Sequence, residues 1–233
     1  MDRVAEFREY PPDFGSPRRI IRIMNGPVDA EGLTYIGSHA GLDRFALSIE
    51  ASQDLVMIFD LAPDATSIDM RTAVLQTYEP AAAPAIANKG WEGVAFRPAH
   101  GGSAPRLYAC QEGEPGQAPT RVLSFPYLPE AGTTLSYQNG SLSVDEPWNA
   151  LDRLGSVAGD LSSVHYDQLT DTLLLLSHLG SRLLRVEPES GEIMDQLALN
   201  RSPQYEGVTL TSDGRLVLVS EPNFVEIFQR PDP

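Results

Sequence analysis

The chain contains a single cysteine among its 233 residues, which excludes a fold held together by internal disulfides. Cys110 ends an apolar run, so we expect a packed, inert thiol rather than a nucleophile. Long hydrophobic runs are missing as well: no window approaches the roughly 18 apolar residues of a membrane helix, and the first residues lack the apolar core of a signal peptide. As written, the sequence predicts a soluble chain with no membrane span and no export signal.

Basic residues are scarce. Only 17 lysines and arginines face 32 aspartates and glutamates, which gives a formal net charge of −15. Such a charge repels phosphate backbones and attracts cations, so we expect no nucleic-acid partner. An acidic surface that serves only solubility would explain the same net charge. If the protein has a charged partner, the net charge favours a metal ion.

The motifs of common catalytic machinery are also absent. The sequence has no Gly-x-Ser-x-Gly, no His-Glu-x-x-His and no phosphate-binding glycine-rich loop. Three of the four histidines, His39, His100 and His165, are scattered, and we interpret each as a surface or packed residue. His178 differs because it takes a position that acids hold elsewhere in the chain. These observations favour a protein that is not an enzyme, and we assign no catalytic residue.

What the sequence does contain is a repeated hairpin, clearest near the C-terminus. Glu206-Gly207 opens a short apolar strand, a turn follows at Asp213-Gly214, and a second strand ends on Glu221. Asp-Gly between two β-rich runs is a strong hairpin signal because glycine takes the positive φ that the turn needs. The two acids should therefore leave the hairpin at the same end.

Similar hairpins start near residues 31, 92 and 162, so the chain carries four copies. A unit of about 40 residues with three or four short strands is typical of a β-propeller blade. We therefore predict an all-β fold, a β-propeller with four recognisable blades and the remnant of an incomplete N-terminal fifth. The opening residue and the closing acid of the copies are Glu31 and Glu50, Glu92 and Glu112, Glu206 and Glu221, and in the degenerate third copy Ser162 and His178.

Outside the repeats, residues 1–17 read as an N-terminal lead-in, and residues 18–230 as a single propeller domain that starts with a strand at Arg18–Met24. An excursion at about 130–155 interrupts the repeats. In it we expect a small hairpin of Thr133–Gln138 and Ser141–Val144, since Asn-Gly between them favours a type I′ turn. A short helix at Pro147–Leu154 should follow.

The innermost strand of each propeller blade lines the central channel, so a glutamate at the start of each would crowd carboxylates around one axis. Such groups repel unless they are protonated, solvated or bridged by a cation. Ca²⁺ suits this role because it takes six to eight oxygen ligands in irregular geometry. Alternatively, these glutamates bond backbone amides or are solvated. The candidate metal ligands are Glu31, Glu92 and Glu206, then Glu50, Glu112 and Glu221, with Asp160 and Ser162 serving the blade that lacks a glutamate.

Three stretches resemble the SdiA-regulated, YjiK-like family: Trp91–Phe96, Leu173–His178, and Glu206–Val208 together with Val219–Asn223. The resemblance extends over about residues 18–230. It implies a propeller distantly similar to NHL-repeat proteins, a Ca²⁺ site and no established biochemical activity, and it leaves the ligands unidentified.

Relatives in this family have an additional N-terminal blade, five in all, and usually an N-terminal membrane anchor or signal. Here only a strand at Arg18–Met24 corresponds to that blade. Three interpretations stay open: the chain start is truncated, residues 1–17 close the ring, or four blades close it. Under the first, the relatives imply a membrane-anchored or periplasmic protein.

The leading functional hypothesis is a Ca²⁺-binding propeller that acts as a binding or scaffold module, with a possible protein partner on one rim. A second is a metal-dependent hydrolase of lactones or phosphate esters, in which channel Ca²⁺ polarises an oxygen and a glutamate or His178 acts as base. A third is a metal-free propeller that binds other proteins through its rims.

Overall fold

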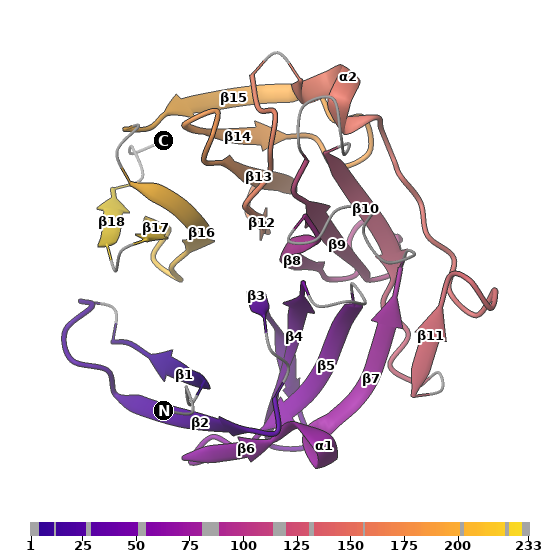
Figure 1. Ribbon diagram of the computed structural model, residues 1–233, viewed down its shortest axis with the longest axis vertical. Coiled ribbons are helices and arrows are strands. Elements are labelled where there is room, and N and C mark those ends of the chain that lie inside the picture. The colour runs from indigo at the N-terminus through magenta and orange to yellow at the C-terminus, as the bar shows by residue number, and fades with distance from the viewer. Residues whose placement is uncertain are drawn as a thin grey trace.

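The chain folds into an almost purely β structure, seen in a computed structural model (Figure 1). The structure describes residues 5–11, 13–26, 29–50, 55–80, 89–113, 120–130, 133–155, 157–200, 203–221 and 224–229. Within them lie two short helices, α1 (Met70–Ala73) and α2 (Ala150–Leu154). Neither is long or apolar enough to cross a membrane. The all-β prediction is confirmed.

The strands form five sheets. The first has the order β1-β2-β6, from Ala5–Glu9, Arg19–Met24 and Ser67–Asp69. The second has the order β11-β7-β5-β4-β3, from Thr134–Ser136, Val74–Glu79, Leu55–Leu61, Leu42–Ile49 and Ala30–His39. The third is β10-β9-β8, from Arg121–Pro126, Arg106–Gln111 and Trp91–Arg97. The fourth is β12-β13-β14-β15, from Ser163–Asp167, Thr172–Ser177, Arg182–Val186 and Ile193–Ala198. The fifth is β16-β17-β18, from Gln204–Leu210, Leu216–Glu221 and Phe224–Phe228.

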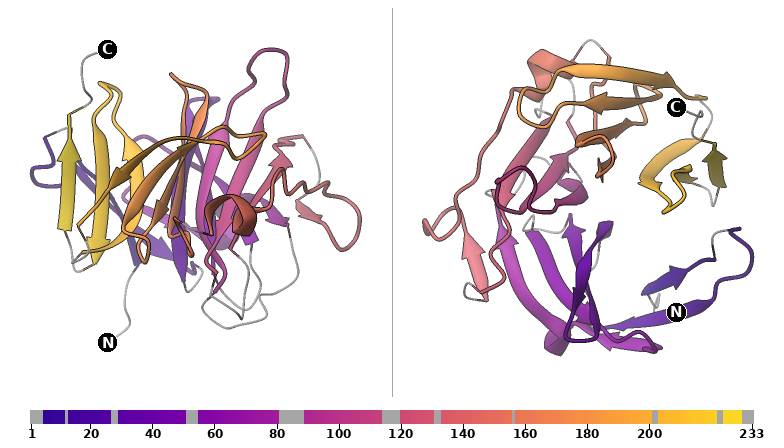
Figure 2. Two further views of the ribbon diagram at one scale, coloured as in Figure 1. Left: turned by 90° about the horizontal axis from the view of Figure 1, so that it is seen from above. Right: turned by 180° about the vertical axis from the view of Figure 1, so that it is seen from behind.

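The sheets stand around a central axis, and β3, β8, β12 and β16 face that axis (Figures 1 and 2). Each of these inner strands contacts the next: β3 with β8, β8 with β12, and β12 with β16. The glycines of the Glu-Gly pairs make this approach possible. A Cβ on Gly32 would lie 2.7 Å from the Cα of Gly93, and a Cβ on Gly93 would lie 2.7 Å from the backbone N of Val164.

The hydrophobic core lies between neighbouring sheets rather than at the axis. The four leucines Leu173–Leu176 are buried on both faces of β13, which confirms a buried strand where the run of leucines could suggest a helix. Trp91 and Cys110 are fully buried. Burial raises the pKa of the Cys110 thiol well above its ordinary value, so the expectation of an inert thiol agrees with the structure.

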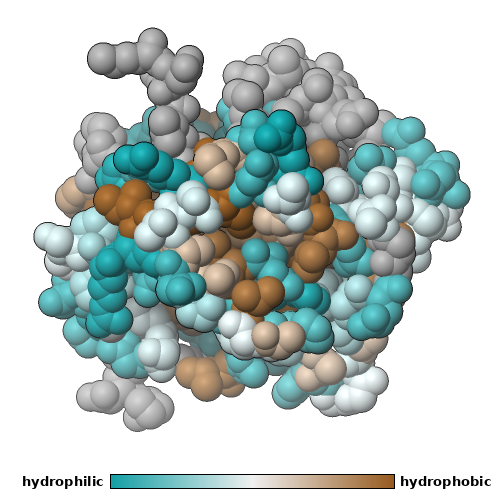
Figure 3. Space-filling model, turned by 90° about the horizontal axis from the view of Figure 1, so that it is seen from below, coloured by the Kyte–Doolittle hydropathy of each residue, from teal (hydrophilic) through white to brown (hydrophobic). Residues whose placement is uncertain are grey.

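The ring is open on one side, between β16-β17-β18 and the first sheet (Figure 1). No ladder joins these two sheets within the described ranges. One face of the fifth sheet packs on the fourth, whereas Val219, Val225 and Ile227 on its other face are exposed. The first sheet packs instead on the second, with the ring of Phe7 stacked on Phe59. Seen from the side of β2, β6 and α1, apolar side chains reach the surface between polar ones (Figure 3).

The structure adds a strand to the N-terminal lead-in and contradicts the hairpin expected in the excursion. The lead-in contains β1, which pairs antiparallel with β2, because Phe7 has an apolar surface to cover; residues 1–4 of this segment lie outside the described residues. In residues 133–155, which the structure describes, the expected hairpin does not form: β11 pairs parallel with the outer edge of β7, which it covers. A type I′ turn needs positive φ at both central residues, and here only Gly140, not Asn139, has it.

The sequence also left β6, α1 and β7 unpredicted. The helix predicted at Pro147–Leu154 is present but shorter. α2 starts after Asn149, whose side chain accepts a hydrogen bond from the backbone N of Asp152.

Candidate metal centre in the central channel

Each Glu-Gly pair forms a β-bulge at the start of an inner strand. In β8, Trp91 pairs with Gln111 and Gly93 with Cys110, so Glu92 is the extra residue. Glu206 is the extra residue of β16 in the same way. In β3 the ladder also shifts across Glu31 and Gly32. A bulge turns a side chain away from the normal alternation of a strand. The same local feature therefore turns a glutamate toward the axis in three hairpins.

The six glutamates predicted as ligands line one cavity of about 570 Å³, at the end of the channel where the inner strands start. They come from three separate sheets, each of which contributes an opening and a closing glutamate. The cavity is also lined by Ser162 and His178, the opening and closing residues of the third copy. Three further lining residues had no role in the sequence prediction: Lys89, Leu179 and Gln204.

Crowding of the carboxylates changes their acidity. Burial, followed by the charges of Glu50 and Glu31, raises the pKa of Glu92 to about 9. Burial and the Glu50 carboxylate raise the pKa of Glu31 to about 7. The pKa of Glu206 is raised by burial as well. These raised pKa values show that the carboxylates are too crowded to ionise at their ordinary pH. The cationic groups of the protein around the cavity do not balance their negative charge.

Two protein groups offset part of this charge. The Nζ of Lys89 lies 2.5 Å from an oxygen of Glu112. The backbone N of Gly90 donates a hydrogen bond to the Glu50 carboxylate at 2.8 Å. Both donors come from the segment that leads into β8. The sequence offered no signal for them, because their place beside the cavity depends on how that segment folds.

The third copy, which lacks the opening glutamate, is built around Asp160 instead. This residue is fully buried and does not line the cavity. One carboxylate oxygen accepts a hydrogen bond from the Ser177 hydroxyl at 2.5 Å, and the other from the backbone N of His178 and of Leu179. That second oxygen also lies 3.0 Å from the Nδ1 of His178.

These contacts set opposite pKa shifts. Burial alone would raise the pKa of Asp160, but hydrogen bonds from His178 and Ser177 outweigh it and hold that pKa below its ordinary value. The contact with Asp160 raises the pKa of His178. Asp160 therefore contacts the imidazole from outside the cavity wall, whereas the six glutamates line the cavity.

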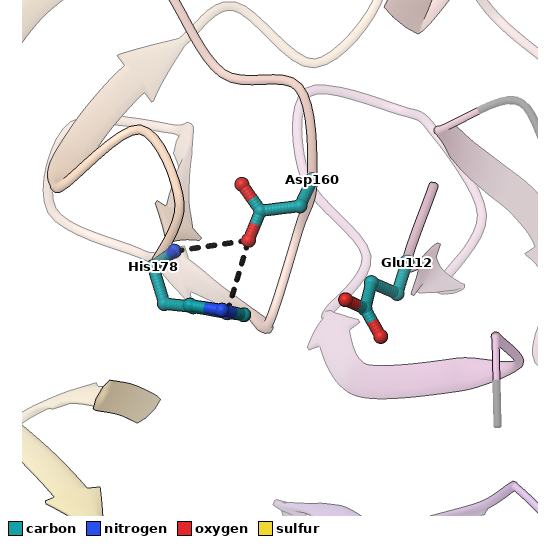
Figure 4. A group of neighbouring side chains, drawn as sticks. All are labelled: Glu112, Asp160 and His178. Carbon is teal, nitrogen blue, oxygen red and sulfur yellow. Dashed lines mark hydrogen bonds and ion pairs between the residues drawn. The ribbon is translucent and has the colours of Figure 1, made fainter. Parts of the chain in front are cut away.

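Among the described residues, one group of three potential ligand side chains has ligand atoms that all lie within 4.8 Å of one another: Glu112, Asp160 and His178 (Figure 4). The predicted opening glutamates do not make such a group. Their carboxylates share the cavity without forming a group within this distance.

A ring of mainly antiparallel sheets with its inner strands around an acidic channel defines the protein as a β-propeller. The chain belongs to the SdiA-regulated family, whose model matches residues 19–229. The resemblance seen in the sequence is thereby confirmed, although Pro222 and Asn223 of its C-terminal motif lie outside the described residues.

The chain is also similar to solved structures. A luciferin-regenerating enzyme matches with 14% identity and a TM-score of 0.52 over 93% of this chain and 65% of that chain, so this chain spans less than two thirds of that enzyme. A protein of unknown function from Bacteroides caccae matches with 12% identity and a TM-score of 0.45, over 95% and 69%. The β-propeller domain of Cps50 (Swd1) from Myceliophteria thermophila matches with 11% identity and a TM-score of 0.42, over 90% and 68%. At this identity the match to the luciferin-regenerating enzyme bears on the fold alone.

Proposed function

We propose that the protein is a Ca²⁺-binding β-propeller that acts as a binding or scaffold module. The observation that carries the proposal is the convergence of six glutamates, from hairpins of three sheets, on one cavity. Burying several carboxylates together is costly unless a cation joins them. The raised pKa values of Glu31, Glu92 and Glu206 express that cost.

Ca²⁺ fits this donor set better than smaller cations do. It accepts carboxylate oxygens at about 2.3–2.6 Å in irregular geometry and tolerates a large, flexible site. The opening glutamates Glu31, Glu92 and Glu206 would bind first, and the closing glutamates Glu50, Glu112 and Glu221 would complete or surround the site. When bound, the ion supplies a positive centre to which an oxygen-rich ligand can attach. The glutamate side chains need to move toward one another, which their flexible arms allow.

The scaffold role follows from where the glutamates lie. Each pair belongs to a different sheet, so one ion would tie the second, third and fifth sheets together at the channel mouth. In an open ring, such a tie would stabilise the arrangement of sheets as a whole. The rim around the ion would then be the surface that meets a partner.

Thermal unfolding with and without Ca²⁺ tests the proposal. At a concentration about 100-fold above Kd, a ligand that binds only the folded state stabilises it by about 2.7 kcal/mol. For a chain of this length that corresponds to a rise of roughly 5–10 °C in Tm. The double variant Glu92→Gln, Glu206→Gln should lose the rise. The matched control Glu130→Gln, Glu192→Gln removes two exposed charges and should keep it. No rise at millimolar Ca²⁺ would refute Ca²⁺ binding.

A metal-dependent hydrolase is the second candidate, and the pairing of His178 with buried Asp160 favours it. An imidazole held by a carboxylate is a common general base. A luciferin-regenerating enzyme shares the fold. A panel of lactone, ester and phosphoester substrates on Ca²⁺-loaded protein tests this candidate. Turnover that is lost with EDTA and with His178→Ala would favour the hydrolase over the module.

A further inference from the structure

His178 is held in one orientation by the residue behind it. The Asp160 carboxylate is fixed by the Ser177 hydroxyl and by two backbone N–H groups, and the Nδ1 of His178 lies 3.0 Å from it. The contact lacks full hydrogen-bond geometry, but a neutral imidazole with Nδ1 this close to a carboxylate oxygen carries its proton on Nδ1 and its lone pair on Nε2. Within the part of the chain that the structure describes, no group bonds Nε2, and the side chain is 21% exposed at the cavity wall.

Carboxylates share the cavity with this imidazole. A ligand atom of His178 and a carboxylate oxygen of Glu112 are within 4.8 Å of each other (Figure 4). Glu206 lines the same cavity and acts electrostatically on His178 together with Glu112. It is not part of the group whose ligand atoms lie within 4.8 Å of one another, so its side chain would have to move to reach a shared ion. One imidazole nitrogen and two carboxylates form a mixed donor set. Such sets suit borderline metals such as Zn²⁺ and Co²⁺, whereas Ca²⁺ takes oxygen ligands.

We propose that His178 Nε2, Glu112 and Glu206 form a second cation subsite for a divalent transition metal, with Asp160 as the positioning residue behind the histidine. Three protein ligands leave one tetrahedral position for water or for a ligand oxygen. The subsite shares Glu112 and Glu206 with the proposed Ca²⁺ ligands, but it is built on His178 and does not require Ca²⁺. It therefore goes beyond the proposed function and can hold even if that function fails.

The role given to Asp160 follows from its hydrogen bonds. Both of its oxygens are already engaged, and the residue is fully buried outside the cavity wall. A carboxylate on the far nitrogen of a metal-binding histidine fixes the ring and raises its basicity, and loss of such a partner typically costs 10–100-fold in metal affinity. Asp160 should therefore act on the metal through His178.

Isothermal titration of the full chain with Zn²⁺, and the visible absorption spectrum with Co²⁺, test the subsite. We expect one Zn²⁺ per chain and Co²⁺ bands that show nitrogen coordination. His178→Gln should abolish both, and Asp160→Asn should weaken Zn²⁺ binding about 10–100-fold with the nitrogen signature retained. The matched control His100→Gln removes an exposed histidine outside the cavity and should change neither.

Zn²⁺ affinity that is unchanged in His178→Gln would overturn the proposal, as would Co²⁺ bands without a nitrogen signature. If Asp160→Asn fails to fold, Ser177→Ala frees one oxygen of the same carboxylate and should weaken Zn²⁺ less than His178→Gln does. Parallel titrations with Ca²⁺ separate the two proposals. Loss of Ca²⁺ binding in Glu31→Gln with Zn²⁺ binding intact supports two sites, whereas equal loss of both metals in every variant overturns a separate subsite.

Discussion

Glu92 has the most strongly raised pKa among the cavity acids, about 9, because it is buried beside Glu50 and Glu31. Metal ligands bind in their deprotonated form, so Ca²⁺ must displace its proton. At pH 7.5 we expect release of about one to two protons per Ca²⁺, from Glu92 and in part from Glu31. Calorimetric titrations in buffers of different ionisation enthalpy measure this number. Glu92→Gln should lower it by about one, and a binding enthalpy independent of the buffer would contradict the assignment.

The same shift predicts how the ion-free protein responds to pH. The Glu92 carboxyl ionises near its ordinary pKa in the unfolded chain but only near 9 when folded. Between these values the folded state binds more protons, so the free energy of unfolding falls as pH rises. Urea unfolding in EDTA should therefore show stability decreasing from about pH 5 to pH 9. Glu92→Gln should flatten this slope, and the exposed Glu192→Gln should not; equal slopes in all three proteins would disprove the prediction.

The sequence could locate the glutamates because each marks its position with a following glycine. It could not reveal the pairing of Asp160 with His178, since both strands of the third hairpin, β12 and β13, lie between the two residues. Their contact depends on the loop before β12 folding back against the end of β13. The one available signal was a departure from the repeat: His178 takes the position at which the other copies have an acid.

At the scale of the elements, the Glu-Gly bulge serves two purposes. The extra glutamate turns toward the axis, and the glycine lets the next inner strand approach. A Cβ on Gly93 would lie 2.7 Å from the N of Val164 and 3.0 Å from the Cys110 sulfur. Gly93→Ala should cost roughly 1–3 kcal/mol of stability, as overpacking does. In thermal unfolding that is a loss of several °C for a chain of this size.

A matched control exists for this substitution. A Cβ on Gly159 would meet no atom within 4 Å, and this glycine does not have positive φ. Gly159→Ala should therefore leave Tm nearly unchanged. Equal effects of the two substitutions would show that the close approach of β8 and β12 does not require glycine.

Elements that repeat were predictable, and elements that do not repeat were not. The hairpins follow from alternating apolar residues and glycine turns, which are local features. By contrast, β11 pairs with β7 across more than 50 residues of sequence, and the three residues of β6 pair with β2. Short parallel contacts of this kind carry no local pattern. They depend on which sheet edges remain unpaired after the hairpins have formed.

At the scale of the molecule, the propeller itself follows from the repeats, but the way the first sheet sits does not. β2 was expected to mark an outer strand of a fifth blade. In the structure it pairs with β1 and β6, and this sheet packs through Phe7 of β1 against Phe59 of the second sheet. Apolar contact between distant segments decides this arrangement, and a single sequence does not encode it in any repeat.

A bound ion that joins three sheets should change the dynamics of all three together. Opening the channel mouth would require release of the ion, so at 100-fold excess over Kd the exchange of protected amides should slow by up to about 100-fold. We expect this in hydrogen–deuterium exchange at the first residues of β3, β8 and β16 and the last residues of β4, β9 and β17. The hairpin of β14 and β15 contributes no residue to the cavity and serves as an internal reference. Protection confined to one sheet would mean that the ion binds to a single hairpin and does not link the sheets.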